Sequence, residues 1–386
     1  MKRLKICAAL LALILALECG YCVAAFTNWV PPLSRLRDTF IETALGTMEH
    51  KWLATVLFPA DIVEAVRAGL EADRLAQEGQ NSSLWETDET PTERDFFELF
   101  PEIDPADFRA FAPVATEELD EFYVNYAGLD EVGLDLRTRQ GDQILAIDAA
   151  NGLMVIRIKG STYKGVLVIG KDPSRLKCAP APQWGTIGDR AGNIAEANNG
   201  LVAMTGSGFG DAKNVAEGAD QAGGAMFSGV AKGRHYPWGY KRVELHLDNR
   251  LYITDANSAY SADCTDATEW TPALIVDGKL VVLEDNGGYT ALNPRACIGQ
   301  TRDESIMFLG IEGRNIDSLG CDAVECARVL ERYGAYQAMN VDGGTSAIVW
   351  YQGEYIMKCS NEDLPEGRRL PNAWVYCANT VPDPEL

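Results

Sequence analysis

The stretch Asn340-Val341-Asp342-Gly343-Gly344-Thr345-Ser346 lies between two apolar runs in the last quarter of the chain. Residues 337–341 and 347–351 are each predicted to form a short strand, because apolar residues dominate both and turn residues bound them. Two glycines directly after an acid allow a sharp turn and a close approach of the backbone to a ligand. Taken alone, the stretch is typical of an ordinary Asp-Gly hairpin turn. Its surroundings favour a functional site.

A helix is predicted immediately upstream, over Asp322–Tyr333. Asp322 and Glu325 have the spacing of a capping box, Leu330 and Tyr333 fall on the apolar side, and Gly334 ends the helix. Strand-like apolar runs bounded by Gly, Asp and Asn occupy residues 152–158, 165–169, 243–247, 274–276, 280–283 and 305–309. Many strands with few helices predict an α+β domain, with a mixed β-sheet core and flanking helices. We expect this domain to span residues 121–380.

The amino terminus differs from the rest of the chain. Residues 1–26 begin with a basic pentapeptide and continue as an apolar run of about membrane-spanning length. We expect a single-pass membrane anchor with the amino terminus inside, because the positive charges precede the apolar run. Cleavage after Ala25 would instead give a secreted protein. Either outcome places the remaining residues outside the cytoplasm, at the cell membrane or beyond it.

Residues 27–120 are expected to form a helical and acidic linker. Asp61 and Glu64 resemble a helix start, and Ile62, Val63 and Val66 follow at helical spacing. Residues 61–121 contain 18 Asp and Glu against four Lys and Arg. Such a segment is typical of a solvated stalk that packs weakly, because it has little apolar surface to bury.

Composition excludes several classes of function. The formal net charge is −22, so a nucleic-acid partner is not expected. Only three histidines are present, which argues against a Ser-His-Asp or Cys-His enzyme and against a multi-histidine metal site. Beyond residue 26, no Cys-x-x-Cys pair occurs among the seven cysteines, so a thiolate zinc site lacks its usual spacing. We therefore expect no metal and no cofactor. Disulfides are permitted, and their pairing stays open.

The residues left for chemistry are carboxylates, amides and arginines, and they recur at strand ends in the last third of the chain. Arg295 begins one such element, Glu312 and Arg314 follow the next strand, and Asn340 and Asp342 end the strand after the helix. Asn372 opens a final strand. The alternative is a set of separate surface turns with routine salt bridges. Arginines beside carboxylates at neighbouring strand ends suit an anionic substrate better.

In their order and spacing, these elements resemble the phosphodiester glycosidase family. The resemblance covers residues 121–378 and is strongest over residues 294–351. It rests on Pro294-Arg295, Ile298-Gly299-Gln300, Gly313-Arg314, Asn340-x-Asp342-Gly343-Gly344-x-Ser346 and Pro371-Asn372. Glu312 stands where the family commonly has Asp, and Thr205 where it commonly has Asn. The anchor and the acidic stalk are similar to those of bacterial members linked to exopolysaccharides.

The resemblance implies hydrolysis of a sugar 1-phosphodiester at the anomeric C–O bond, in a glycan of the cell envelope or an exopolysaccharide. Phosphate leaves more readily than a sugar alkoxide, so the need for a strong general acid is relaxed. Asp342 would be nucleophile or general base, and Glu312 its partner. The implied substrate-binding residues are Arg295, Gln300, Arg314, Asn340, Gly343, Gly344, Ser346 and Asn372, with the two arginines clamping the phosphate.

Two alternatives stay open from the sequence. One is a non-catalytic envelope protein that binds anionic glycans. The other is a hydrolase of the same fold that acts on a different anionic polymer.

Overall fold

The computed structural model describes residues 2–47, 50–83, 85, 94–113, 119–124, 134–210, 223–235, 240–282, 289–382 and 384. The chain divides into two compact units. The first comprises residues 1–73 and 287–292, and the second comprises residues 74–286 and 293–386.

The first unit is helical. Its helices are α1 (Lys2–Phe26), α2 (Pro31–Leu45), α3 (Lys51–Leu57) and most of α4 (Ala60–Ala76). A small apolar core of Ile41, Ala44, Ala54 and Val63 holds α2, α3 and α4 together. Helix α4 begins at Ala60, so Asp61 lies in the first turn and not at the capping position expected from the sequence.

The predicted anchor corresponds to α1, which is helical throughout. In the described part of the chain, no single helix is long and apolar enough to cross a membrane. Residues 10–26 and 31–45 satisfy the length and composition criteria only as a pair, with a bend of 70° between them.

The described residues of the second unit form three β-sheets and the helices α5 (Phe96–Leu99), α6 (Pro105–Phe111), α7 (Ala191–Ala197) and α8 (Ala323–Arg332). In spatial order, the nine-stranded sheet comprises β1 (Tyr123–Val124), β2 (Gln143–Asp148), β3 (Leu153–Lys159), β4 (Lys164–Gly170), β15 (Ile306–Ile311), β14 (Arg295–Thr301), β16 (Ala335–Asn340), β12 (Ala273–Val276) and β13 (Lys279–Leu280). The second sheet comprises β10 (Leu251–Asp255), β9 (Lys241–His246), β11 (Cys264–Trp270), β7 (Ala225–Phe227) and β8 (Val230–Lys232). The third comprises β18 (Glu354–Tyr355), β17 (Val349–Tyr351), β6 (Gly200–Thr205), β19 (Asn372–Cys377) and β5 (Leu176–Pro180).

The α+β class expected from the sequence is confirmed, but the sheets are antiparallel and not mixed. Every pair of neighbouring strands described above is antiparallel. The reason lies in the connections. Short turns join β2 to β3, β3 to β4 and β14 to β15. A short turn reverses the direction of the chain, so the strands that it joins are antiparallel. Helix α8 carries the chain from β15 to β16, which pairs antiparallel with both β14 and β12.

The two strands around the Asp-Gly-Gly stretch do not form a hairpin. Strand β16 lies in the nine-stranded sheet, whereas β17 pairs with β6 in the third sheet. Residues 341–348 therefore carry the chain from one sheet to another. The sequence predicted both strands, but pairing with distant partners decided their sheets.

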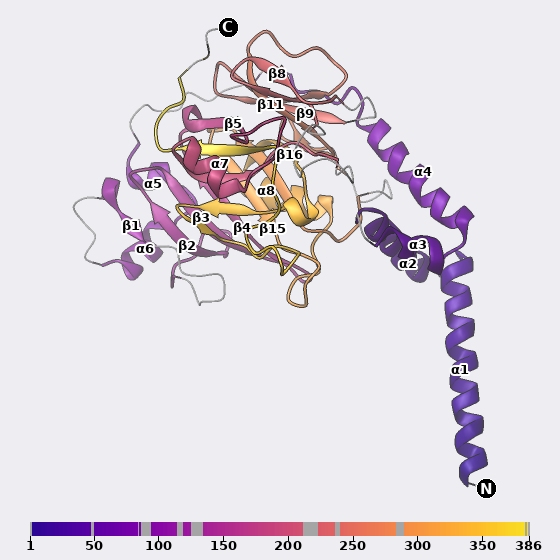
Figure 1. The fold of residues 1–386 in the computed structure, drawn as a ribbon. Helices are drawn as coiled ribbons and strands as arrows, with labels where there is room; N and C mark the ends of the chain where they lie inside the picture. Colours follow the sequence, from indigo (N-terminus) through magenta and orange to yellow (C-terminus); the bar gives the residue numbers. More distant parts are fainter. Residues whose placement is uncertain are drawn as a thin grey trace. The chain divides into compact units, whose positions relative to one another are not determined.

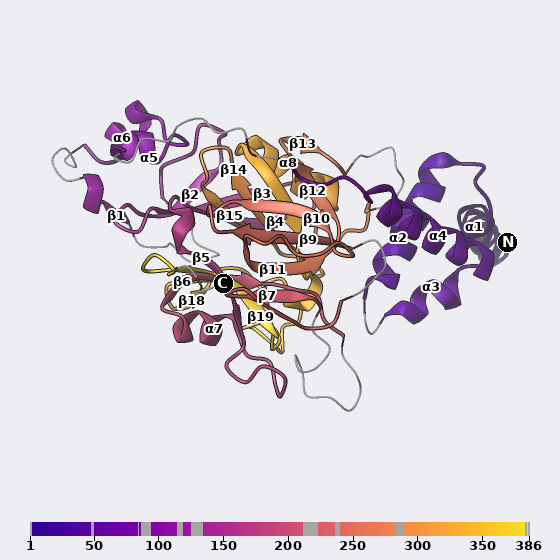
Figure 2. The same cartoon turned by 90° about the horizontal axis from the view of Figure 1, so that it is seen from above.

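One apolar core joins all three sheets. It includes Val168 and Phe308 from the large sheet, Val243 and Leu245 from the second, and Trp374 from the third, each almost fully buried. Helix α8 packs on β12, β14 and β16, and α7 packs on β6 and β19 (Figure 1; Figure 2). Burial of these apolar faces is the main stabilising contribution.

Residues 77–83 and Trp85 are hydrogen-bonded to strands of the second unit and are not a loose linker. The Gln77 amide donates to the Ala273 carbonyl and accepts from the Ala273 N–H. Ser82 pairs with Ile253 on the edge of β10, through its backbone N–H and its hydroxyl. The Trp85 indole donates to the Leu251 carbonyl. The compact second unit begins at Arg74. The expected domain bounds of 121–380 stay a prediction.

A second segment of the expected linker is also packed. Phe96, Phe100 and Phe108 are buried, and the ring centroids of Phe96 and Phe108 lie 4.8 Å apart. Glu102 forms a buried ion pair with Lys171 at 2.6 Å. This packing could not be predicted from the acidic composition, because a few well-spaced aromatic residues supply the apolar surface.

Candidate active site

The candidate site forms where the Asp342-Gly343-Gly344 turn is held between two other segments. On one side, the Asp342 N–H donates to the Gly206 carbonyl at 3.3 Å. On the other, the Gly344 N–H donates to the Pro294 carbonyl at 3.0 Å. Gly344 has φ +61°, a conformation that favours glycine. A Cβ on Gly343 would lie 2.8 Å from the Pro294 oxygen, so the turn packs directly on that peptide.

Two further glycines pack against the segment Asn293-Pro294. A Cβ on Gly313 would lie 2.8 Å from the Pro294 nitrogen, and a Cβ on Gly320 would lie 2.6 Å from the Asn293 carbonyl. Glycine is required at all these positions because backbone contacts backbone. The glycines thereby bring the ends of β14, β15 and β16 into one cluster.

Both predicted phosphate-binding arginines belong to this cluster. Arg295 begins β14 directly after Pro294, and its Nε donates to the Cys321 carbonyl at 3.3 Å. Arg314 follows β15 with φ +59°, and its Nη2 donates to Asn293 Oδ1 at 2.8 Å. The Arg314 Nη1 atom would lie 3.2 Å from a Cβ on Gly344, so the guanidinium borders the turn.

The two arginines are close enough to affect each other. Burial lowers the pKa of Arg314 from its usual value, and the neighbouring Arg295 charge lowers it further. The Arg314 Nε is buried and has no hydrogen-bond partner within the described part of the chain. An unpaired buried donor beside a second cation is costly, and a bound anion would satisfy both.

Glu312 is almost fully buried at the end of β15. Its Oε1 accepts from the Lys358 N–H at 3.0 Å, and its Oε2 lies 4.0 Å from Lys164 Nζ. These contacts brace the segment that leads to Arg314. The predicted role of Glu312 as partner of Asp342 stays a proposal.

The predicted amide ligands hold backbone segments in place. Asn372 is buried, its Oδ1 accepts from the Ser207 N–H, and its Nδ2 donates to Ser207 Oγ. It thereby fixes the loop whose Gly206 carbonyl binds Asp342. Asn340 Nδ2 donates to the carbonyls of Thr271 and Val341. Both amides contact the framework around the turn.

Gln300 is not brought to this cluster. It lies five residues after Arg295 on β14, on the opposite face and about 17 Å along the strand. Its Oε1 accepts from the Leu251 N–H, and its Nε2 donates to the carbonyls of Asn249 and Glu304. These bonds link the large sheet to the second sheet.

Three buried hydroxyl groups around the turn have no hydrogen-bond partner in the described ranges. They belong to Thr205, Thr271 and Ser346. Thr205 precedes Gly206, Thr271 accepts from Asn340 through its carbonyl, and Ser346 follows the turn. Ser346 is one of the predicted substrate-binding residues. Hydroxyl groups with unused donors are suited to a polyhydroxylated ligand, provided a small movement exposes them.

Asn293, Ser207 and Cys321 position the predicted residues but were not themselves predicted from the sequence. Asn293 binds Arg314, Ser207 binds Asn372, and Cys321 binds Arg295. Ordinary polar residues in loops carry no local pattern that separates them from other turns. The available signal for Asn293 was its place directly before the Pro-Arg pair.

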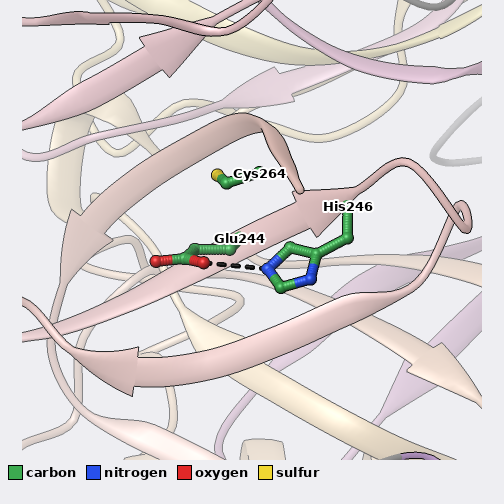
Figure 3. A group of neighbouring side chains, drawn as sticks. All are labelled: Glu244, His246 and Cys264. Carbon is green, nitrogen blue, oxygen red and sulfur yellow. Dashed lines mark hydrogen bonds and ion pairs between the residues drawn. The ribbon is translucent and has the colours of Figure 1, made fainter. Parts of the chain in front are cut away.

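One group of side chains has the composition of a metal site. Glu244 and His246 on β9, with Cys264 on β11, offer three ligand atoms within 4.8 Å of one another (Figure 3). Glu244 is, however, already bonded through both oxygens. Its Oε1 accepts from Arg242 at 2.7 Å, and its Oε2 contacts His246 Nε2 at 2.8 Å. Since the Arg242 guanidinium compensates its charge and His246 is hydrogen-bonded to it, Glu244 already has partners without a cation.

Comparison with known proteins gives a family for this region. Residues 194–377 match the sequence profile of the phosphodiester glycosidases. No curated protein sequence matches the chain.

Solved structures with a similar chain trace are also known. The catalytic domain of zebrafish N-acetylglucosamine-1-phosphodiester alpha-N-acetylglucosaminidase, auto-inhibited by pro-peptide, aligns with 58% of this chain and 82% of its own, at 15% identity and a TM-score of 0.48. A putative exported protein from Burkholderia pseudomallei aligns with 56% and 74%, at 14% identity and a TM-score of 0.41. A hypothetical protein from Synechocystis aligns with 61% and 63%, at 14% identity and a TM-score of 0.40.

Proposed function

We propose that this chain, which belongs to the phosphodiester glycosidase family through residues 194–377, hydrolyses the glycosidic bond of a sugar 1-phosphodiester. The observation that carries the proposal is the pair Arg295 and Arg314 beside the Asp342 turn, with a buried donor of Arg314 left for a ligand. Such a pair suits a phosphodiester anion, because guanidinium groups bind phosphate oxygens through paired N–H donors.

The reaction breaks the bond between the anomeric carbon and the bridging oxygen. Water supplies a hydroxyl group to the anomeric carbon, and its proton leaves with the phosphate, so the products are a free sugar and a phosphomonoester. Charge builds on the phosphate as the bond breaks, and the two arginines stabilise it there. A strong general acid is not required, because phosphate is a good leaving group.

Asp342 is the proposed nucleophile or general base. Its backbone is fixed between Gly206 and the turn on Pro294, so its carboxylate is carried on a segment with little freedom. Fixed placement matters, because a misplacement of about 1 Å can cost a factor of about a hundred in rate. Glu312 is the proposed second carboxylate. Gly343, Gly344, Ser346, Asn340 and Asn372 shape the site around these groups.

The setting of the reaction is also a proposal. The basic and apolar residues 1–26 support a place at the cell membrane, with the catalytic domain outside. A substrate there would be a phosphodiester-linked glycan of the cell envelope or an exopolysaccharide. Such a substrate is anionic, and the chain's net charge of −22 would restrict binding to the local cationic site.

The test is hydrolysis of sugar 1-phosphodiesters by the purified chain. Candidate sugars are supplied as the 1-(p-nitrophenyl phosphate) diesters, and the products are separated by mass. Release of free sugar together with p-nitrophenyl phosphate supports the proposal. Release of sugar 1-phosphate with p-nitrophenol would indicate P–O cleavage and contradict it. Saturable binding of the diesters without turnover would support the non-catalytic binder.

A further inference from the structure

Three buried cysteines lie beside the proposed phosphate site. Cys321 precedes α8, Cys326 lies in its second turn, and Cys297 lies on β14. The Sγ atoms of Cys321 and Cys326 are 3.2 Å apart, and the Cys297 thiol is hydrogen-bonded to Cys326. Each of the three residues is at most 1% exposed. Neither the proposed mechanism nor the core packing requires sulfur at these positions.

Cys321 and Cys326 occupy the two positions whose side chains form a hydrophobic staple at the start of many helices. Asp322 is the N-cap residue and accepts from the Glu325 N–H, which makes Cys321 the residue before the cap and Cys326 the fourth helical residue. In many helices these two positions carry apolar side chains in contact, which fixes the direction in which the chain enters. Here the contact is between two sulfur atoms.

The backbone of Cys321 also braces both arginines. Its carbonyl accepts from Arg295 Nε at 3.3 Å and from the Asn293 N–H at 3.1 Å. Its own N–H donates to the Asn293 carbonyl at 3.2 Å. Cys321 therefore helps to position Arg295 directly. It helps to position Arg314 through Asn293, whose Oδ1 accepts from Arg314.

We propose that Cys321 and Cys326 form a disulfide that ties the arginine-bearing segment to α8 and keeps the phosphate site assembled. The effect on the site rests on the proposed function, whereas the disulfide itself does not. The present Sγ separation exceeds an S–S bond of about 2.05 Å by only about 1.1 Å, which side-chain rotation can close. The Cys297 thiol also donates to Asn340 Oδ1 at 3.9 Å. It takes no part in the proposed bond and stays a thiol.

The bond forms by exchange with a disulfide oxidant. The Cys326 thiolate attacks one sulfur of the oxidant and releases its first thiol. The Cys321 thiolate then attacks the mixed disulfide, forms the Cys321–Cys326 bond and releases the second thiol. Two electrons and two protons pass to the oxidant disulfide, which becomes two thiols. Because both sulfurs are buried in the folded chain, the exchange precedes the packing of α8 on the sheet.

Of these three thiols in the folded, reduced chain, Cys326 is the one whose pKa is lowered, whereas the pKa values of Cys297 and Cys321 are raised. Burial opposes ionisation, but hydrogen bonds from the Cys297 and Cys321 thiols and the charge of Arg295 outweigh it and lower the pKa of the Cys326 thiol. Disulfide formation removes this ionisable thiol from the neighbourhood of Arg295.

Peptide mapping tests the bond independently of activity. The full chain is refolded with oxidised glutathione, then denatured, alkylated and digested with trypsin. Residues 315–328 form one peptide containing both cysteines, and residues 296–302 form a second containing Cys297. The proposal expects the first peptide unalkylated and two hydrogen atoms lighter than its dithiol form, with the second alkylated. Alkylation of both Cys321 and Cys326, or a cross-link between the two peptides, would overturn it.

Binding of inorganic phosphate tests the effect on the arginines. In the oxidised chain, the dissociation constant is expected to be lower than in the reduced chain by about fivefold or more. In the double variant Cys321→Ser/Cys326→Ser, the dissociation constant for phosphate should be the same under oxidising and reducing conditions. In Cys297→Ser, the dissociation constants of the oxidised and reduced forms should differ as they do in the wild type. Equal phosphate binding by both redox forms of the wild type would refute the bracing role. A chain that binds phosphate but hydrolyses no diester would count against the proposed function alone.

Discussion

Substitution of Gly343 by alanine tests whether the turn positions the site. The added Cβ would lie 2.8 Å from the Pro294 carbonyl oxygen, about 0.6 Å short of ordinary contact. Neither the Cβ nor the carbonyl oxygen can rotate away, because both are attached directly to the backbone. The turn and the Pro294-Arg295 segment must therefore move apart. We expect a loss of about 1–3 kcal/mol in the free energy of unfolding from overpacking. We also expect a fall in kcat/KM of about tenfold to a hundredfold, because the reacting groups are displaced by a fraction of an ångström.

A matched variant separates lost stability from lost geometry. Gly334 has φ +81°, and a Cβ there would meet no atom within 4 Å. Gly334→Ala should cost about 1–2 kcal/mol through backbone strain alone and leave the site unchanged. Urea denaturation and steady-state kinetics on both variants give the comparison. The reasoning fails if Gly343→Ala retains kcat/KM within twofold, or if Gly334→Ala loses as much activity as Gly343→Ala.

Further predictions concern the charged residues of the site and those that hold residues 77–81. Asp342→Asn should lower kcat by about a hundredfold or more without changing the melting temperature, and near-normal turnover would remove Asp342 from the mechanism. Arg295→Lys should raise KM about tenfold, because an ammonium group cannot make the planar two-point contact; an unchanged KM would argue against a clamp. Lys241 is buried, and its Nζ donates to Asp255 Oδ1 at 2.7 Å and to Gln77, Gln80 and Asn81. Lys241→Met should therefore cost about 3–5 kcal/mol in urea denaturation, and a cost below about 1 kcal/mol would show that residues 77–81 are not held by Lys241. Burial opposes ionisation of Asp255, but hydrogen bonds from Lys241, Asn81 and Gly79 outweigh it and hold the pKa of its carboxyl below the usual value. Its stabilising contribution should be complete above about pH 4 and be lost as pH falls further, and Asp255→Asn should flatten that acid limb of the stability profile.

Local features were predictable from the sequence. The predicted helix over residues 322–333 corresponds to α8 with Asp322 at its N-cap, because capping and helical periodicity depend on residues a few positions apart. The strand over residues 152–158 corresponds to β3 within one residue. Strand partners depend on distant residues, so the antiparallel pairing and the separate sheets of β16 and β17 were not predicted.

For the site, too, some features could be predicted from the sequence, whereas others depend on distant residues. The order of the motifs predicted that Arg295, Arg314 and the Asp342 turn belong together, and the glycines explain how the backbones meet. Gln300 shares a motif with Arg295, yet the register of β14 carries it to the other end of the strand. The packing of residues 77–83 and 85 could not be predicted from their polar composition, since the contacts are mostly hydrogen bonds between Gln77, Ser82 and Trp85 and backbone groups of distant strands.

In the proposed reaction, the bond that breaks joins the anomeric carbon to the phosphate oxygen. Hydrolysis of a sugar 1-phosphodiester in water enriched in oxygen-18, with mass analysis of both products after one turnover, shows which bond breaks. The label should enter the released sugar, and the phosphomonoester should stay unlabelled. Label in the phosphate, with none in the sugar, would mean attack at phosphorus and would refute cleavage at the anomeric carbon.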